Sequence, residues 1–270
     1  MKTILLHIFD DSSLESRLQV ALDIARGHDA HLTCVQPTTQ FTPIALGPLG
    51  GEFVTGVNFK DMEAAERAHR EKIEKRLKGE AVSWDWQVGL GDAATILTER
   101  SRLADLVIVS QSFDKRDASD KPLPIAGDVA VHAQSAILVV PAEQMSFDCE
   151  GPIVIAWNGS AEAAKAVRSA LPMLKMAKDV HLVTVGEDHG NFPHSEASLY
   201  LARQGVPTTL HELTGKPGEA SDIVMDFASK YNAAALVMGA YGHSRLRETL
   251  FGGVTKDLLG NAKIPLLMGH

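Results

Sequence analysis

The sequence predicts an α/β protein made of two tandem repeats of a five-stranded parallel sheet flanked by helices. Three observations lead to this prediction. Short apolar runs alternate with helical patterns along the whole chain, which indicates βαβ units and a parallel sheet. The alternation pauses in the polar stretch 141–151 and then begins again. The two series match with a period of about 130 residues, which is too long for a solenoid and typical of a duplicated domain.

In the first half, most of the expected strands are short runs rich in apolar residues. Each expected helix combines apolar and charged residues at the spacing of an amphipathic face. The strands are predicted at 3–9, 31–36, 83–88, 105–109 and 136–140. The helices are predicted at 13–26, 61–78, 93–103 and 125–133. Ser12 or Ser13 stands where a side chain would cap the first helix.

The second half repeats the series, with Ser160 as the expected cap of its first helix. Its strands are predicted at 153–157, 180–185, 208–213, 234–238 and 265–268, and its helices at 161–175, 195–204, 219–230 and 254–259. The domain boundaries that follow are 1–142 for the first domain, 143–151 for the linker and 152–270 for the second domain.

When the two halves are aligned without gaps, similar residues occupy matching positions at the ends of corresponding strands. Residues 5–12 lie over 153–160, so that Asp10 matches Asn158. Residues 105–110 lie over 234–239 in the same way. The duplication therefore allows each candidate site residue to be compared with its counterpart in the other half.

Composition and charge exclude several classes of protein. The 270 residues are 45% hydrophobic and 22% charged, which is typical of a soluble globular protein. A net charge of −8 argues against sequence-independent binding of nucleic acid, and no apolar stretch is long enough to span a bilayer. Cys34 and Cys149 form no metal or redox spacing, and no close set of histidines indicates a metal site. We expect a cytoplasmic protein with reduced thiols and no bound metal.

The most informative motif is a glycine-rich segment that follows the fourth strand of the second half. Gly239, Gly242 and Gly252 have the spacing G-x2-G-x9-G between an apolar strand and a helix. Glycines allow a backbone to approach a ligand closely, and a helix N-terminus offers free N–H groups to an anion. In open parallel sheets, ligands bind beyond the strand ends where the strand order reverses, here next to the first strand. This places Asn158, whose amide can donate and accept hydrogen bonds, near the glycines.

The residues predicted to form this site come from the first, second and fourth strands and from the start of the last helix. They are Ala156, Trp157, Asn158, Val185, Met238, Gly239, Gly242, His243, Gly252, Gly253, Val254 and Thr255. For two of them the alternatives stay open. Trp157 would flank an adenine or pack in the core, and Val185 would line the base pocket or belong to the core. Arg245 and Arg247 would reach phosphates or remain solvated.

These features together resemble the universal stress protein family in its tandem form, over nearly the whole chain. In that family the motif G-x2-G-x9-G-[S/T] binds ATP or AMP, with or without Mg²⁺. The resemblance implies a Rossmann-like fold related to the adenine nucleotide alpha hydrolases, with strand order 3-2-1-4-5 in each domain. It also implies that the two domains pair through their last strands, here 136–140 and the segment from Pro265 to Met268.

The sequence departs from the family pattern at several positions. Gly253 replaces the Ser or Thr, so that Thr255 would have to supply a hydroxyl, and Asn158 stands at the family's Asp position. In the first half the glycine and hydroxyl positions are taken by Ser110, Phe113, Leu123 and Pro124. Side chains there would crowd the ligand, and proline removes an N–H donor. We therefore expect one nucleotide site per chain, in the C-terminal half.

Three functions remain open at this stage. The first is a stress-response or signalling protein that binds ATP or AMP without a catalytic step. The second is a slow ATPase or nucleotidyl transferase, although the loop lacks the lysine that phosphoryl transfer favours. The third is an interaction module that binds no nucleotide. Residues 38–58, rich in glycine and almost uncharged, would pack at an interface such as that of a homodimer, or be disordered.

Overall fold

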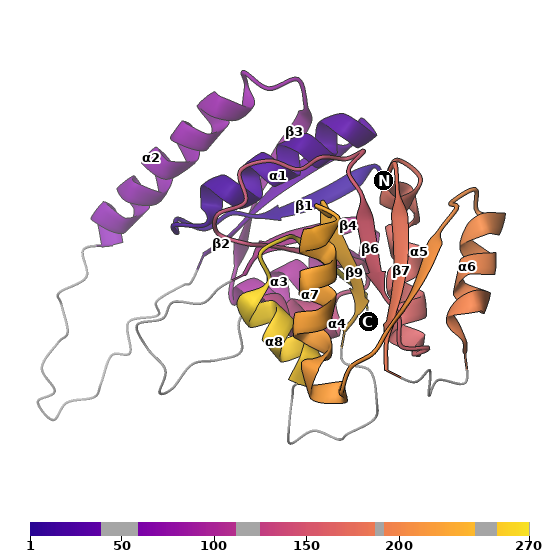
Figure 1. Ribbon diagram of the computed structural model, residues 1–270. Helices are drawn as coiled ribbons and strands as arrows, with labels where there is room; N and C mark the ends of the chain where they lie inside the picture. The colour runs from indigo at the N-terminus through magenta and orange to yellow at the C-terminus, as the bar shows by residue number, and fades with distance from the viewer. Residues whose placement is uncertain (39–58, 112–124, 187–191, 241–252, 270) are drawn as a thin grey trace, which may run out of the picture.

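The computed structural model describes residues 1–38, 59–111, 125–186, 192–240 and 253–269 (Figure 1). The segment 39–58, which carries most of the expected interface loop, lies outside these ranges. The first half contains β1 (Thr3–His7), α1 (Leu14–His28), β2 (His31–Thr38), α2 (Phe59–Leu77), β3 (Ser83–Leu90), α3 (Ala93–Arg100), β4 (Leu106–Ser110), α4 (Ile125–His132) and β5 (Ala136–Val140). The second contains β6 (Ile153–Ala156), α5 (Ala161–Leu174), β7 (Val180–Val185), α6 (His194–Arg203), β8 (Thr209–Leu213), α7 (Ala220–Lys230), β9 (Ala235–Gly239), α8 (Gly253–Asn261) and β10 (Leu266–Gly269).

The strands form one continuous sheet of ten strands in the order β3-β2-β1-β4-β5-β10-β9-β6-β7-β8. Within each half the order is 3-2-1-4-5 and all pairings are parallel, which confirms the predicted fold class. The two halves meet where β5 and β10 pair antiparallel, with Leu138 opposite Leu267. Because both strands are buried, this junction is a part of the core.

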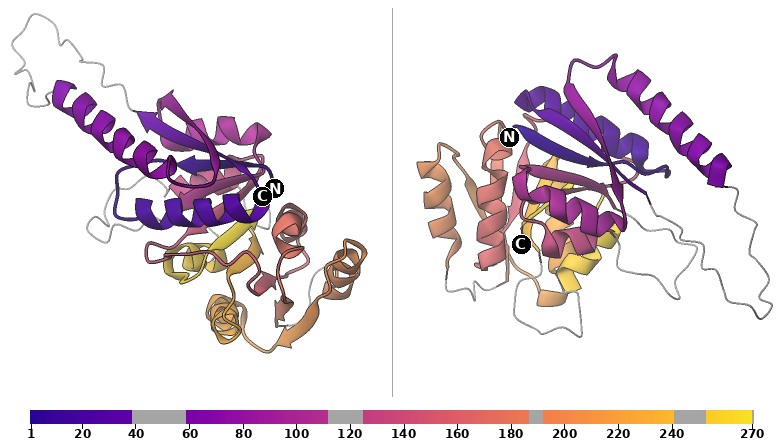
Figure 2. Two further views of the ribbon diagram at one scale, coloured as in Figure 1. Left: turned by 90° about the horizontal axis from the view of Figure 1, so that it is seen from above. Right: turned by 180° about the vertical axis from the view of Figure 1, so that it is seen from behind.

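Helices cover both faces of the sheet, so that the molecule has three layers (Figure 2). One hydrophobic cluster joins the sheet to α1, α2, α5 and α6, and a second joins it to α3, α4, α7 and α8. The inner strands are buried on both faces, which explains why most of them are continuous apolar runs rather than alternating ones, whereas the edge strands β3 and β8 are partly exposed. None of the helices in the described part of the chain is long and apolar enough to cross a membrane.

A few element boundaries differ from the sequence prediction. The first strand ends at His7 rather than at residue 9, because the chain turns away after Ile8 donates to the carbonyl of Val35 at 2.8 Å. The third helix ends at Arg100, and its expected last turn, Ser101–Leu103, is a 3-10 turn. The last helix continues beyond residue 259 and ends at Asn261.

The two predicted helix caps have different outcomes. Ser160 caps α5 as predicted, since its Oγ accepts from the N–H of Ala163 at 3.1 Å. Ser13 occupies the N-cap position of α1 but forms no side-chain cap. Its own N–H instead donates to the Asp11 carboxylate at 2.8 Å, so the prediction of a serine cap was wrong for this helix. The carboxylate of Asp11 lies near the first turn of α1, where a negative charge interacts favourably with the helix dipole.

The polar stretch between the halves lies against α1. Phe147 is buried in the core cluster, and its N–H donates to the carboxylate of Asp23 at 2.8 Å. Ser16 donates from its hydroxyl to the carbonyl of Ala142. The segment that joins the halves is therefore held by the first domain.

Candidate functional site

A cavity of about 180 Å³ lies at the carboxyl ends of β6, β7 and β9, beneath α7 and α8. Its position is the point where the strand order of the second half reverses, since β6 lies between β9 and β7. Such a switch point is where open α/β sheets bind ligands. The lining residues are Ala156, Trp157, Asn158, Ser160, Val183, Val185, Ala220, Val224, Met238, Gly239, Val254, Thr255 and Leu258.

The structure brings most of the predicted site residues together in this cavity. The predicted residues that line it are Ala156, Trp157, Asn158, Val185, Met238, Gly239, Val254 and Thr255. Gly253 is the first residue of α8 and is exposed, next to the lining residue Val254. Gly242, His243 and Gly252 lie outside the described residues.

Several lining residues were not in the predicted set. Ala220 and Val224 lie one turn apart on α7, and Leu258 lies one turn after Val254 on α8. The spacing i, i+4 places such pairs on one helix face, and this signal could have extended the prediction. Val183 is 1% exposed and also forms a wall of the cavity.

The polar groups of the cavity are few. Asn158 accepts from the N–H of Ser160 through Oδ1 at 3.2 Å, which leaves its amide N–H₂ as a donor toward a ligand. The hydroxyl of Thr255, a residue that is 7% exposed, supplies a second polar group. The lining residues within the described chain are all uncharged. The cavity therefore fits an apolar or aromatic group that is oriented by a small number of hydrogen bonds.

Gly239 has a packing role that its place in the motif did not indicate. A Cβ at this position would lie 2.5 Å from the backbone nitrogen of Ala163 in α5. The absence of a side chain thus allows the first turn of α5 to approach the end of β9. At Gly253, in contrast, a Cβ would meet no atom of the described residues within 4 Å.

In the first half, a buried arginine occupies the corresponding strand ends. The side chain of Arg17 is fully buried and donates to the carbonyls of His7 at 2.7 Å and Phe9 at 2.5 Å. It also donates to the carboxylate of Asp11 at 2.6 Å and to the hydroxyl of Ser110 at 2.9 Å. These contacts tie α1 to β1 and β4. Sequence analysis missed Arg17, because an arginine on a helix is normally exposed.

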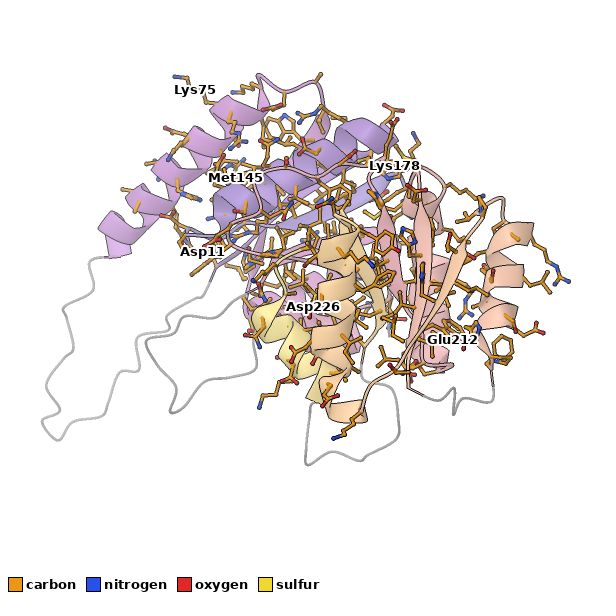
Figure 3. The ribbon with its side chains drawn as sticks, viewed as in Figure 1. Asp11, Lys75, Met145, Lys178, Glu212 and Asp226 are labelled. Atoms are coloured by element: carbon orange, nitrogen blue, oxygen red, sulfur yellow. The ribbon has the colours of Figure 1, made fainter. Side chains whose placement is uncertain are left out.

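The acid that corresponds to Asn158 is Asp11 rather than Asp10. Each of Asp11 and Asn158 accepts from the N–H of the serine two residues later, which precedes the next helix. Asp11 lies at the start of α1 (Figure 3), whereas the Asp10 side chain is 80% exposed and contacts His69 at 3.3 Å. The gapless alignment was wrong here, because two more residues separate strand and helix in the first half. Asp11 is already engaged by Arg17.

His7 is the most strongly perturbed histidine near these strand ends. Burial, and next the positive charge of Arg17, lower the pKa of His7 to about 4, although the charge of Asp11 acts in the opposite direction. The imidazole is therefore neutral at pH 7. A neutral histidine beside a buried arginine avoids a second positive charge in the core.

Comparison with known proteins finds similarity to universal stress proteins. The model of the universal stress protein family matches residues 151–270. A universal stress protein of Synechocystis is 28% identical over 133 residues, which are 48% of this chain and 45% of that protein. The stress response protein NhaX of Bacillus subtilis is 27% identical over 169 residues, which are 61% of this chain and 97% of that protein. The chain thus aligns with less than half the length of the Synechocystis protein.

Solved structures show the same fold. A universal stress protein from Archaeoglobus fulgidus has a TM-score of 0.74 at 11% identity, with 99% of this chain and 97% of that chain covered. A putative universal stress protein from Pseudomonas aeruginosa has a TM-score of 0.62 at 18% identity, with 98% and 92% covered. Because both likenesses extend over almost the whole chain, they include both halves of the sheet.

Proposed function

The chain belongs to the universal stress protein family through its C-terminal half, residues 151–270, and from this premise we propose that it is a stress-response protein that binds ATP or AMP there. The observation that carries the proposal is the convergence of β6, β7, β9, α7 and α8 on one cavity at the strand-order switch. Residues selected from the sequence for nucleotide binding line that cavity.

The shape and chemistry of the cavity favour the nucleobase as the group that it holds. Val183, Val224 and Leu258 provide apolar walls, and Asn158 provides an amide donor. The volume of about 180 Å³ lies below the roughly 300–1,000 Å³ of pockets that enclose a whole ligand. The base would therefore be enclosed, while the phosphates extend toward the first turn of α8, whose free N–H groups suit anions.

The residues that line the cavity support a protein that binds a nucleotide and does not transfer its phosphoryl group. Phosphoryl transfer needs positive groups and metal-binding carboxylates held around the phosphates. The described lining residues carry no charge. The function proposed is therefore that of a nucleotide-dependent binding or signalling protein, and the two observations that support it are the uncharged lining and the switch-point position.

One nucleotide site per chain follows from the asymmetry between the halves. In the first half, Asp11 forms an ion pair with the buried Arg17, and Ser110 bonds to the same guanidinium. In the second half, the counterparts Asn158 and Gly239 both line the cavity. We propose that the first half stabilises the joined sheet and that the second half holds the nucleotide.

The proposal is tested with the purified full chain. Mass spectrometry of the denatured protein is expected to show a co-purified adenine nucleotide, and calorimetric titration with ATP is expected to give one site per chain. Ala220→Trp places an indole in the cavity from the first residue of α7 and is expected to abolish binding. Ala93→Trp is the matched control, since Ala93 is the partly buried first residue of the equivalent helix α3. Equal ATP affinity in the two variants would refute the assignment of the site.

A further inference from the structure

A second cavity, distinct in its chemistry, lies between α5 and α6 on the opposite face of the sheet. Its volume is about 550 Å³, within the roughly 300–1,000 Å³ typical of small-molecule sites. We call it the α5/α6 groove. Its lining residues are Trp157, Gly159, Ser160, Ala161, Ala164, Val167, Arg168, Phe192, Glu196, Ala197, Tyr200 and Arg203.

Among the described residues, the hydrogen bonds and ion pairs of α6 do not reach α5, and the groove between the two helices is open. Besides Arg168, α5 contributes the small residues Ala161, Ala164 and Val167 to the lining, at a spacing of three. The polar side-chain bonds of α6 are directed to the other side. Ser198 bonds to Thr208 at 2.7 Å, and His194 contacts Glu212 at 3.1 Å.

In the first half, side-chain contacts join the corresponding pair of helices. There α1 and α2 are bridged by Arg76, which contacts the carboxylate of Glu15 and the amide oxygen of Gln19, the latter at 2.7 Å. Arg26 of α1 reaches Glu80, just beyond α2, at 2.6 Å. The corresponding helices α5 and α6 carry Arg168 and Arg203 along an open groove instead. Figure 2 shows α5 and α6 next to each other on the side of the sheet away from α7.

The charges in the groove favour an anion. Within the described part of the chain, neither Arg168 nor Arg203 forms an ion pair or a side-chain hydrogen bond. Glu196 is the single acid among the lining residues that the structure describes, so that the net charge of these residues is positive although the whole chain carries −8. Two guanidinium groups without carboxylate partners, beside a cavity, are the arrangement that receives a carboxylate, sulfonate or phosphate.

The aromatic side chains that line the groove favour a ligand whose anionic group is attached to an aromatic ring. Trp157, Phe192 and Tyr200 line the groove, and Phe192 is 51% exposed. The indole of Trp157 is fixed, because its Nε1 donates to the carbonyl of Phe192 at 3.2 Å. Aromatic rings provide large contact areas with a preferred stacking geometry. The floor of alanine and valine leaves space for a flat group.

From these observations we propose that the α5/α6 groove is a second ligand site, which takes a small planar aromatic molecule with one anionic group. Arg168 and Arg203 bind the anionic group, and the aromatic side chains hold the ring system. Trp157 and Ser160 line both this groove and the nucleotide cavity, so that the two sites share a wall. The proposal does not depend on nucleotide binding.

The test uses two fluorescent probes with the same ring skeleton and different charge. These are 8-anilinonaphthalene-1-sulfonate, which is an anion, and N-phenyl-1-naphthylamine, which is neutral. The full chain is expected to bind one equivalent of the sulfonate. The double variant Arg168→Gln and Arg203→Gln is expected to weaken sulfonate binding at least tenfold and to leave binding of the neutral probe unchanged. Arg102→Gln, at an exposed arginine of the first half, is the charge-matched control.

A second variant locates the probe. Ala164→Trp fills the floor of the groove and is expected to remove binding of both probes, while the nucleotide-cavity variant Ala220→Trp retains it. Loss of sulfonate binding in Ala220→Trp would place the probe in the nucleotide cavity and overturn the proposal. Unchanged sulfonate affinity in the double arginine variant would overturn it as well. The arginine variants change exposed side chains, so this readout stands even where Ala164→Trp folds poorly.

Discussion

Gly239 at the end of β9 lies so close to Ala163 in α5 that a Cβ would stand 2.5 Å from the Ala163 backbone nitrogen. Its neighbour in the sheet, Gly269, has the same relationship with Ala166, at 2.7 Å. The positions of this pair in the first half are held by Ser110 and Val140, which are paired in the same register. Two glycines thus allow α5 to pack directly on the strand ends beside the cavity at the strand-order switch.

The first prediction concerns this close approach. Gly239→Ala should lower the free energy of unfolding by about 1–3 kcal/mol, because the methyl group must push backbone atoms of α5 away. Urea denaturation followed by circular dichroism measures the change. Gly253→Ala is the control, since a Cβ there meets open space in a helix and should change stability by less than about 1 kcal/mol. Equal destabilisation by the two substitutions would show that the close approach of Ala163 does not make residue 239 more sensitive to a methyl group than residue 253.

The second prediction concerns the hydroxyl that the family motif has and this chain lacks. Gly253→Ser is expected to raise the affinity for ATP about tenfold, since one hydrogen bond to a charged group contributes about 1.5–3 kcal/mol. Space for the side chain exists at the start of α8. Calorimetric titration of both proteins with ATP gives the ratio. Gly253→Ala separates the hydroxyl from the effect of a Cβ, and a gain of equal size in that variant would contradict the prediction.

Much of the fold could be predicted from local sequence patterns, because the tertiary contacts favour the same helices and strands. The inner strands are mostly apolar runs buried on both faces, and Ser160 stands directly before α5 as a cap. The cavity residues could be predicted from the sequence because parallel strands end at one edge of the sheet. Residues that follow β6 and β9 therefore lie close together. Val224 and Leu258 were missed, although the spacing i, i+4 from Ala220 and Val254 places them on the same helix faces as those two lining residues.

Other features depend on contacts that the sequence does not encode locally. Asp11 rather than Asp10 corresponds to Asn158, because the loop after β1 is longer and no local signal marks the extra residues. The burial of Arg17 depends on acceptors from β1 and β4 that are brought together by the sheet. Residue type alone predicts an exposed arginine at such a position.

The third prediction concerns Arg17. Arg17→Lys keeps the charge but loses the planar fork that reaches the carbonyls of His7 and Phe9 and the side chain of Ser110. Breaking a buried ion pair of this kind costs about 3–5 kcal/mol, and the lysine variant should lose a large part of that amount. Urea denaturation provides the measurement. Arg102→Lys at an exposed position should be neutral, and an equally small effect at residue 17 would show that the buried network contributes little.

The fourth prediction concerns the pH dependence of stability. The pKa of His7 is lowered from an ordinary value of 6.5 to about 4 in the folded protein, by burial and then by Arg17. Below pH 6.5 the unfolded chain binds a proton at this residue that the folded chain does not bind. Stability is therefore complete above pH 6.5 and falls as the pH decreases from 6.5 to about 4. The contribution lost between pH 7 and 5 should be roughly 2 kcal/mol.

A substitution isolates this contribution from those of other histidines. Burial also lowers the pKa of His28, His181 and His211, so the wild-type protein loses stability toward acid for several reasons. His7→Phe removes the titration and retains a ring of similar size. The free energy of unfolding of both proteins is measured in urea at pH 7 and at pH 5, and the difference between the two pH values is compared. That difference should be smaller in the variant, because the other histidines contribute equally to both proteins. If the difference between pH 7 and pH 5 were the same in both proteins, His7 would take up its proton at the same pH in the folded and unfolded states. The charge of Arg17 would then be neutralised by Asp11 more completely than the lowered pKa of His7 implies.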